Sequence, residues 1–520
     1  MSIGGRRLWT YFLLSGILLH LAAGVALFAI VILLPDYSLG DLLHKAKQRL
    51  GNRHPTISAV VAATINATGL QPASEDATSL TLPPFPGPEM WLAHGTLPGG
   101  FARVRYDNAG VPQQMPAGPF AAENFDNMVL IDSEKALLTV LRDAKAGDII
   151  TLAPGTYRFS QRRLSLGGSG LPDRPIYVRA DRLGDVRIEL DTLEGFFVNR
   201  SFWVFENLSI HGTCSNDSKC EHAFHVVGHA VGTVLRNNEL IDFNAPLKVN
   251  GLFSENGDQF PNHGLVHNNN VYNTRARKTG NPVSLLNINA GDGWVVSANF
   301  IADFAKSGGN RVSYAAFMKS NSRNGVFERN LVICHWKLQP QGNVRLGLSF
   351  GGGGSSAKHS RNRDNSTEHT GGIMRNNVIA RCPLDVGIYL NKSAYTQVHN
   401  NLLIGTTGID VRFKSSSASI HNNVLDGRIR DRDGGIHNAD NNLVEAACSW
   451  LTRMFDDCGS KAWYQDALRG DLRVKSAEKL IDQGNTEPRG ERDFCGNRRL
   501  RPNDIGPIEY DAGPLCLPTL

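Results

Sequence analysis

The chain has 520 residues, of which 41% are hydrophobic, so it is long enough for two or three domains with a sizeable core and cannot be disordered throughout. Lys and Arg total 54, Asp and Glu total 49, and the net charge is only +5. This balance argues against a dedicated nucleic-acid-binding protein, which would usually carry a stronger basic excess.

The first predicted element is a membrane anchor at residues 1–34. Residues 11–34 form an apolar run of 24 residues without Asp, Glu, Lys or Arg, which is long enough to cross a bilayer. A cleavable signal peptide has a shorter apolar core that ends at a small-residue cleavage site, so we expect an uncleaved signal anchor. The protein would contact the membrane through residues 11–34.

Residues 35–125 are predicted to link this anchor to the body of the protein. Apolar residues from Leu39 to Leu50 have helical spacing with basic residues between them, which predicts a juxtamembrane helix. This helix could lie on the membrane surface or simply follow the span. Nine of the 24 prolines fall within residues 70–120, and such richness is typical of a semi-rigid, extended spacer.

The eight cysteines indicate the compartment. Three pairs are close in sequence and predict disulfides: Cys214 with Cys220, Cys448 with Cys458, and Cys495 with Cys516. Cys334 and Cys382 lie inside apolar runs and are expected to be buried thiols. An even count with close pairs favours an oxidising compartment, whereas the absence of CxxC spacing disfavours the rival interpretation of a zinc site.

Basic residues lie on both sides of the predicted span, so the positive-inside rule does not decide its orientation. The cysteines decide it instead, because disulfides persist outside the reducing cytoplasm. We therefore expect a single-pass protein of the bacterial inner membrane, with its body in the periplasm.

An asparagine repeat runs through residues 126–445. Each unit has an apolar residue, two polar residues that often include Asn-Asn, and further apolar residues. The last Asn of each unit falls at positions 207, 238, 269, 299, 330, 377, 401, 423 and 442. The step of 47 residues between positions 330 and 377 is either one coil with a long insertion or two short coils.

This repeat predicts an all-β fold, a right-handed parallel β-helix (solenoid) of about ten coils. Equivalent positions of successive coils stack at the inter-strand spacing, apolar side chains point inward, and Asn tolerates the left-handed backbone of a tight turn. Stacked Asn side chains can also hydrogen-bond along the ladder. A leucine-rich repeat would need its Leu signature, and a propeller would need longer units.

Both open ends of a solenoid need caps. The amphipathic stretch from Glu134 to Arg142 is expected to form a capping helix at the first end. Residues 446–520, which contain the last two predicted disulfides, are expected to form a C-terminal capping region.

Three stretches resemble known β-helix proteins. Residues 144–157 and 169–180 are similar to the opening of chondroitinase-B-like and alginate-lyase-like proteins, polysaccharide lyase family 6. Residues 493–510 are similar to the C-terminal signature of many secreted bacterial β-helix proteins. The resemblance implies an anionic polysaccharide as partner. In these lyases a Lys acts as base, an Arg acts as acid, and calcium neutralises the uronate carboxylate.

The resemblance also implies roles for individual residues. Residues 317–324 are similar to the segment that carries the catalytic Lys, which places the base on Lys319. Residues 344–347 match the segment of the acid loosely, which places the acid or carboxylate clamp on Arg345. Asn287 or Asn289 resembles the Asn that contributes to the calcium site.

The chain departs from the family at the calcium site. The two expected carboxylate ligands correspond to Val312 and Tyr314, and neither can replace a hard anionic ligand. We therefore expect no calcium cofactor of the usual kind. Either another cation, such as an Arg, neutralises the uronate, or the site is not catalytic.

Chemistry at a uronic acid begins with removal of the proton beside the carboxylate. The step needs a base within hydrogen-bond reach and a positive field that stabilises the carbanion. Arg323 and Arg412, besides Arg345, are candidates for that field, and Lys392 and Lys414 extend the basic surface to later coils. We predict that these residues bind the substrate.

The functional hypothesis is a membrane-anchored envelope protein that acts on a uronate polysaccharide by β-elimination or epimerisation. A Lys-Ser pair recurs at Lys319, Lys392 and Lys414, which a repeated surface turn would also explain. The alternative is therefore a non-catalytic polysaccharide-binding or assembly scaffold with the same fold.

Two further groups are interpreted as structural. His222, His225 and His229 alternate along one segment, as expected for a strand edge, although three converging His could also bind metal. Asp385 and Asp410 would suit a glycoside hydrolase, but the motifs of polygalacturonases are absent.

Overall fold

The computed structural model describes residues 105–106, 112–113, 127–338, 343–383, 385–445, 463–467, 470–475, 477–485, 491–513 and 516. The predicted anchor at residues 1–34, most of the 35–125 linker and the predicted Cys448–Cys458 pair lie outside these residues. Among the residues that are described, no helix is both long and apolar enough to cross a membrane.

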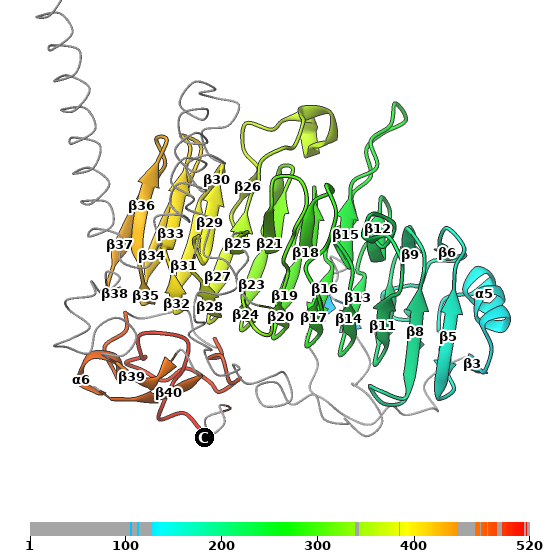
Figure 1. The fold of residues 1–520 in the computed structure, drawn as a ribbon, viewed down its shortest axis with the longest axis horizontal. Coiled ribbons are helices and arrows are strands. Elements are labelled where there is room, and N and C mark those ends of the chain that lie inside the picture. The colour runs from blue at the N-terminus through cyan, green and yellow to red at the C-terminus, as the bar shows by residue number, and fades with distance from the viewer. Residues whose placement is uncertain are drawn as a thin grey trace, which may run out of the picture. The chain divides into compact units, whose positions relative to one another are not determined.

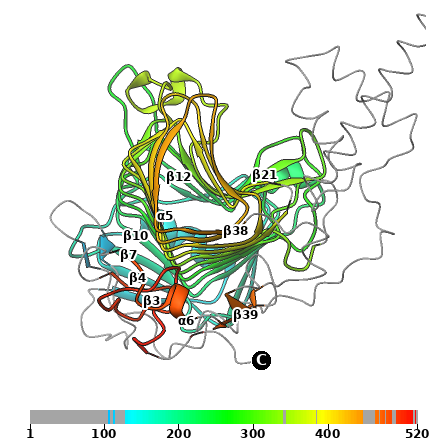
Figure 2. The ribbon, with the colours of Figure 1, turned by 90° about the vertical axis from the view of Figure 1, so that its left-hand side faces the viewer.

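Three long sheets of parallel strands surround the core (Figures 1 and 2). The first sheet has 12 strands: β3 (Asn127–Ile131), β4 (Asp148–Leu152), β7 (Ile176–Arg179), β10 (Trp203–Glu206), β13 (Val234–Arg236), β16 (Leu265–His267), β19 (Val295–Ser297), β23 (Val326–Glu328), β27 (Ile373–Arg375), β31 (Thr396–His399), β34 (Ser417–His421) and β37 (Ile436–Asp440). The second sheet has 11 strands: β5 (Gly155–Phe159), β8 (Val186–Leu190), β11 (Ser209–Gly212), β14 (Glu239–Ile241), β17 (Asn270–Tyr272), β20 (Phe300–Ala302), β24 (Leu331–Ile333), β28 (Val378–Cys382), β32 (Leu402–Thr406), β35 (Val424–Asp426) and β38 (Leu443–Glu445). The third sheet has 10 strands: β6 (Leu164–Ser165), β9 (Glu194–Val198), β12 (His222–Val227), β15 (Leu247–Asn250), β18 (Val283–Asn289), β21 (Val312–Lys319), β25 (Val344–Phe350), β29 (Ile388–Asn391), β33 (Gly408–Arg412) and β36 (Arg428–Arg432).

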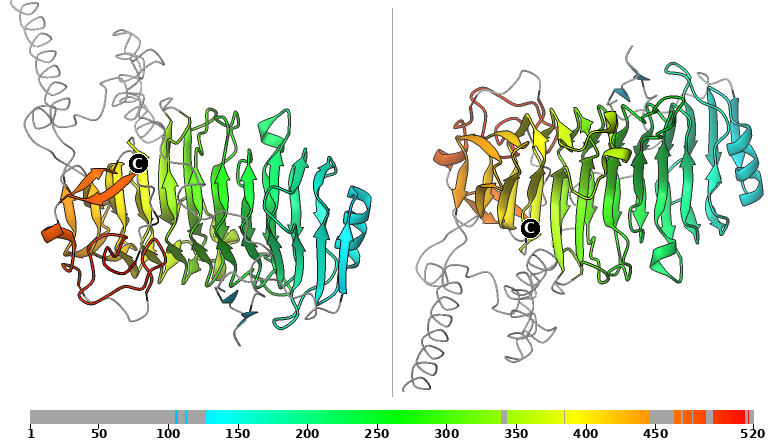
Figure 3. Two further views of the ribbon diagram at one scale, coloured as in Figure 1. Left: turned by 90° about the horizontal axis from the view of Figure 1, so that it is seen from below. Right: turned by 90° about the horizontal axis from the view of Figure 1, so that it is seen from above.

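Each complete coil gives one strand to each sheet, and the next coil pairs with it in parallel (Figure 3). For example, β10, β11 and β12 pair with β13, β14 and β15. The predicted all-β parallel β-helix is confirmed, and its long parallel sheets are consistent with the right-handed course that parallel connections favour.

Smaller elements complete the described part of the chain. The strands are β1 (Arg105–Tyr106) with β2 (Pro112–Gln113), the three-stranded sheet of β22 (Ser322–Arg323), β26 (His369–Thr370) and β30 (Ser393–Ala394), and β39 (Tyr464–Asp466) with β40 (Asp471–Val474). The helices are α5 (Glu134–Asp143), α6 (Ala477–Leu480), and the 3₁₀ turns η2 (Asp217–Lys219), η3 (Ala357–His359) and η4 (Arg361–Arg363).

Apolar side chains of all three sheets fill the centre of the coils. Phe196, Phe205 and Phe224 illustrate the packing, because their rings lie 4.9–5.3 Å apart and are fully buried. The predicted capping helix is confirmed: α5 buries Leu137 and Leu141 against this core, in contact with β5 and β6. A second apolar cluster joins the second sheet to residues of the C-terminal region, among them β39 and β40.

An asparagine ladder ties the coils together. In each step the Oδ1 atom of one Asn accepts the backbone N–H of the equivalent residue in the preceding coil, at 2.9–3.0 Å. The ladder contains Asn238, Asn269, Asn299, Asn330, Asn377, Asn401, Asn423 and Asn442. Because Asn330 bonds Asn377 directly, the 47-residue step is one coil with a long insertion rather than two short coils.

The two asparagines of each pair have different structural roles. The first takes the left-handed backbone that turns the corner, with φ near 50–55° at Asn237, Asn268 and Asn376, and the second forms the ladder. Asn207 belongs to the first kind, with φ 60°, and Leu208 stands at the ladder position of its coil. Asn207 thus lies one position before the predicted ladder, although its Oδ1 atom accepts a 2.7 Å hydrogen bond from Asn237 Nδ2 of the next coil. In the coils of Asn299 and Asn330 the single Asn takes the ladder position, and Ala298 and Arg329 take the left-handed turn.

We expect Asn330→Leu to lower the free energy of unfolding by about 2–3 kcal/mol, because it removes the acceptor of the buried Asn299 N–H and the amide donor to the carbonyl of Val296. Denaturant unfolding followed by Trp fluorescence measures the change. Asn442→Leu, at the last and partly exposed step, is the matched control and should cost less than about 1 kcal/mol, since water replaces the lost bonds. Equal costs at both positions would contradict a cooperative buried ladder.

Three disulfides lie within the described residues. Cys214–Cys220 and Cys495–Cys516 confirm two predicted pairs. Cys334 and Cys382 are also joined, so their prediction as buried thiols was wrong. Each follows or ends a strand of the second sheet, β24 or β28, and the insertion that separates them by 48 residues leaves their coils directly stacked.

Candidate functional site

A groove of about 900 Å³ lies over the third sheet where β15, β18 and β21 are neighbours. Loops at residues 251–253, 280–282, 306–310 and 352–359 complete its walls. None of the described residues that line it is Asp or Glu, whereas three are lysines: Lys248, Lys306 and Lys319. A concave surface with one sign of charge concentrates ligands of the opposite sign, so the groove suits an anion.

Strand register places four polar side chains on its floor. Lys248 of β15 pairs with Asn287 of β18, and Asn289 of β18 pairs with Lys319 of β21. The two asparagines therefore lie between the two lysines. The structure thus brings together three of the predicted site residues, Lys319, Asn287 and Asn289, as the resemblance implied.

Lys319 is half-buried at the end of β21. Its Nζ donates to the carbonyl of Gly353 at 3.0 Å and lies 4.7 Å from the centre of the Phe317 ring. Burial lowers the pKa of Lys319, and the carboxylate of Glu368 partly opposes that shift. A lysine with a lowered pKa is a better base, because more of it is neutral near pH 7.

Lys248 is a groove residue that the sequence analysis missed. Its Nζ donates to Asn287 Oδ1 at 2.9 Å. Burial, with a smaller contribution from the nearby charge of Lys319, lowers the pKa of Lys248 to about 7, and the attraction of Glu221 partly opposes that shift. No sequence motif identifies Lys248. The only signal is that it alternates with the buried Val249 along β15, one coil before Asn287, which points its side chain outward beside the predicted site.

The glycine-rich loop that follows β25 forms the wall beside Lys319. Gly351 has φ 76°, and a Cβ atom there would lie 1.8 Å from the carbonyl oxygen of Asn391, so only glycine fits. Beyond the loop, Ser355 donates to Glu368 at 3.1 Å and shares a 3.0 Å hydrogen bond with Ser320. This network holds the loop against the end of β21.

Aromatic and basic side chains join two loops at one end of the groove. Phe253 and His359, both lining residues, have ring centres 6.0 Å apart. Behind them, Arg361 lies 3.9 Å from the centre of the Phe260 ring, and Arg363 pairs with Asp258 at 2.8 Å. The insertion in the 47-residue step thus packs on the loop at residues 251–263.

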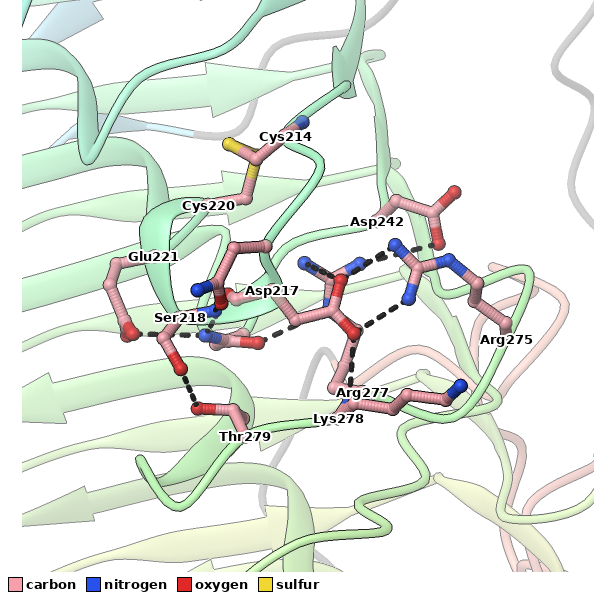
Figure 4. Close-up of polar contacts among 12 residues, drawn as sticks. Cys214, Asp217, Ser218, Cys220, Glu221, Asp242, Arg275, Arg277, Lys278 and Thr279 are labelled. Atoms are coloured by element: carbon pink, nitrogen blue, oxygen red, sulfur yellow. Dashed lines mark hydrogen bonds and ion pairs between the residues drawn. A yellow bond between two sulfur atoms is a disulfide. The ribbon is translucent and has the colours of Figure 1, made fainter.

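An ionic cluster anchors the opposite wall (Figure 4). Asp217, on the short loop closed by the Cys214–Cys220 disulfide, accepts two 2.6 Å hydrogen bonds from Arg275 and lies 3.3 Å from the buried Arg277. Burial raises the pKa of Asp217, but the hydrogen bonds from Arg275 and the Lys278 N–H, together with the charges of Arg275 and Arg277, outweigh it and hold that pKa below its usual value. The segment from Arg275 leads to Gly280 and Pro282 of the groove.

Arg345, the predicted acid, does not face the groove. It is 2% exposed and donates to the carbonyl of Cys334 and to Asn343 Oδ1 at 3.3 Å, with Asp303 3.8 Å away. Its neighbours Val344 and Leu346 pack in an apolar cluster with Tyr314, so strand alternation places Arg345 on the other side of β25. The structure uses it to hold the turn after β24.

The other predicted substrate-binding residues lie outside the groove. Arg323 pairs with Asp292 at 2.9 Å, Arg412 pairs with Asp433 at 2.5 Å, and Lys392 donates to the carbonyl of Asn365 at 3.1 Å. Lys414 is exposed. Arg412 ends β33, and Lys392 follows β29, so both lie beside later strands of the same third sheet.

Val312 and Tyr314 line the groove, where the resemblance would place carboxylates. Burial raises the pKa of Tyr314, which keeps its hydroxyl neutral. Throughout the described ranges, no group of three or more His, Cys, Asp or Glu could hold a metal ion. The residues of this groove therefore do not fit a calcium ion, which takes anionic oxygen ligands.

The two other groups noted in the sequence have structural partners. His222 bonds the carbonyl of Ala245 at 2.9 Å, and His225 lies 3.3 Å from Glu194. Asp410 is buried and pairs with Arg430 at 2.7 Å and with Arg432. These contacts account for the side chains without a metal or a hydrolase site.

No protein-family model matches the sequence. A search of curated proteins gives no match either. Among solved structures, an alginate lyase from Paenibacillus sp. str. FPU-7 is 16% identical (61% of this chain, 95% of that one, TM-score 0.36). Pectate lyase Pel9A is 16% identical (74% and 96%, TM-score 0.46), and a mannuronic-acid-specific family 6 lyase from human gut microbiota is 15% identical (62% and 76%, TM-score 0.37). The structures found include a family 6 lyase, the family that the sequence resembles, but likenesses at this level assign neither a family nor a reaction.

Proposed function

We propose that this groove binds an acidic, uronate-containing polysaccharide and that Lys319 removes the proton beside the uronate carboxylate, leading to β-elimination or epimerisation. The observation that carries the proposal is a half-buried lysine of lowered pKa in a groove whose described lining has three lysines and no carboxylate. A protein held at the bacterial inner membrane through residues 11–34, with its β-helix in the periplasm, would meet such polymers in the cell envelope.

The proposed chemistry follows from these groups. Neutral Lys319 accepts the proton from the carbon next to the carboxylate, and the positive field of the groove stabilises the charge that develops there. In elimination, the electron pair of the broken C–H bond forms a C=C double bond as the bond to the leaving oxygen breaks, and that oxygen takes up a proton from water. In epimerisation, a proton returns to the same carbon from the opposite face.

A second candidate function is polysaccharide binding or assembly without catalysis. The observation that favours it is the position of Arg345, which leaves the groove without the acid that the resemblance implied. The aromatic ring of Phe253 and the lysines would then bind the polymer, and the later strands with Arg412 would extend the contact.

The test is to incubate the protein with alginate, polygalacturonate and chondroitin and to follow the unsaturated product by its ultraviolet absorbance. Binding is measured in parallel by affinity electrophoresis, and epimerisation by exchange of solvent deuterium into the polymer. Absorbance growth supports elimination, exchange without absorbance supports epimerisation, and binding alone supports the scaffold. Failure to bind any uronate polymer would contradict both candidates.

We expect Glu368→Gln to shift the rising limb of the pH–rate profile to lower pH. Burial lowers the pKa of Lys319 and Glu368 raises it, so removing this carboxylate lowers that pKa further. Since the neutral lysine is the active form, activity then appears at lower pH. Gln retains the acceptor for Ser320 and Ser355. Glu478→Gln, at an exposed position, is the control, and an unmoved or upward-shifted limb would contradict the assignment.

A further inference from the structure

The strongest unexplained feature of the groove is Lys248, which donates to an Asn that was expected at a metal site. Asn287 is one of the two alternatives, with Asn289, for the Asn that the resemblance assigns to a calcium site. Its Oδ1 atom accepts hydrogen bonds from Lys248 Nζ at 2.9 Å and from Asn289 Nδ2 at 2.7 Å. An amide oxygen has two lone pairs, so these two donors saturate it.

The second asparagine is engaged in the same way. Asn289 Oδ1 accepts from Ser320 Oγ at 3.2 Å, and its Nδ2 atom also reaches the carbonyl of Val249 at 3.1 Å. The hydrogen bonds therefore fix both side chains in an orientation that serves an ammonium group. Together with Val312 and Tyr314, these contacts leave the groove without a free anionic ligand for a divalent cation.

The ammonium of Lys248 retains donors for a ligand. It has three N–H groups, and within the described residues it donates one to Asn287. It lies near enough to Lys319 for the two charges to repel, and Glu221 attracts it from the neighbouring wall. A carboxylate bound by Lys248 would stabilise its ammonium group, because an anion favours the charged form of a neighbouring lysine.

We propose that Lys248 replaces the divalent cation in this groove and binds the carboxylate of the uronate unit next to Lys319, so that recognition of the acidic polymer needs no metal. The inference rests on the proposed function, since it specifies how the groove holds its uronate. Lys248 is thus a binding residue that acts on the substrate carboxylate, and Lys319 acts on the adjacent carbon.

The experiment compares Lys248→Met with the unchanged full-length protein. Met retains the apolar length of the side chain and removes its charge. Isothermal titration measures the affinity for alginate and polygalacturonate oligosaccharides and for the same oligosaccharides after chemical reduction of their carboxylates to alcohols. Each titration is run in EDTA and again in excess Ca²⁺. Circular dichroism and thermal unfolding check the fold, and Lys145→Met, at an exposed position on the capping side, is the control.

We expect Lys248→Met to weaken binding of an acidic oligosaccharide by about 10- to 100-fold, the loss typical of one charge-assisted hydrogen bond, and to leave binding of the reduced oligosaccharide unchanged. Lys248→Arg should restore part of the loss, and neither EDTA nor Ca²⁺ should alter the affinity. An unchanged affinity in Lys248→Met, or an affinity that EDTA abolishes and Ca²⁺ restores, would overturn this inference alone. No binding of any acidic oligosaccharide by the unchanged protein would overturn the proposed function as well.

Discussion

Lys319→Ala is expected to lower kcat on a uronate polymer by about 10²–10⁴-fold, the usual contribution of a general base. The physical reason is that the lysine is the half-buried amine of lowered pKa at the end of β21, beside the Gly353 carbonyl and the two asparagines of the floor. Lys319→Arg should be equally inactive, because a guanidinium remains protonated in the accessible pH range. The measurement is initial rate by absorbance of the unsaturated product, or by deuterium exchange if the reaction is epimerisation.

The charge-preserving variant separates chemistry from binding. Lys319→Arg should bind the polymer within a few fold of the unchanged protein, whereas a merely electrostatic role for Lys319 would preserve activity as well. Lys145→Ala, remote from the groove, should have no effect. A Lys319→Ala protein that keeps a tenth or more of the original rate would assign the base to another residue.

The double variant Cys334→Ala/Cys382→Ala is expected to lose about 4 kcal/mol of stability. The disulfide closes a segment of 48 residues and so lowers the chain entropy of the unfolded state. This effect grows with the length of the closed segment. Both cysteines lie fully inside the core, so the lost sulfur contacts add to the effect. Denaturant unfolding of the purified protein measures the change.

The matched control is Cys214→Ala/Cys220→Ala, whose disulfide spans only 6 residues and should cost about 2 kcal/mol. Since that disulfide brackets Asp217, its removal should also affect the wall that Arg275 and Arg277 anchor. If the short disulfide proved the more stabilising of the two, the loop-closure account of Cys334–Cys382 would fail.

The asparagine repeat was a reliable guide to the fold because it reports a local requirement of every coil. Asn is favoured at the corner because it tolerates the left-handed backbone there. A second Asn is favoured at the ladder position because its side chain accepts a hydrogen bond from the backbone N–H of the preceding coil. Such requirements recur in sequence wherever the coil recurs. They predicted the stacked parallel sheets. Asn207 differs from the other predicted ladder residues because it takes the turn position of its coil and Leu208 takes the ladder position.

The site was predictable only in part, for a related reason. Lys319, Asn287 and Asn289 lie in motifs that resemble a known family, and alternation along β18 and β21 places them outward together. Arg345 was misplaced because a motif match does not report on which side of β25 a side chain lies. Lys248 was missed because it is 39 residues before Asn287 and becomes its neighbour only through the stacking of coils.

The sequence by itself therefore determined the coil, since backbone hydrogen bonds and turn geometry act between positions at a fixed spacing. Only the tertiary structure decided which coils are neighbours across the long insertion, and with it the Cys334–Cys382 bond and the walls of the groove. It also decided which charged side chains lie close together. Burial and the nearby Lys319 lower the pKa of Lys248, and both depend on distances in space that cannot be read from residue spacing along the chain.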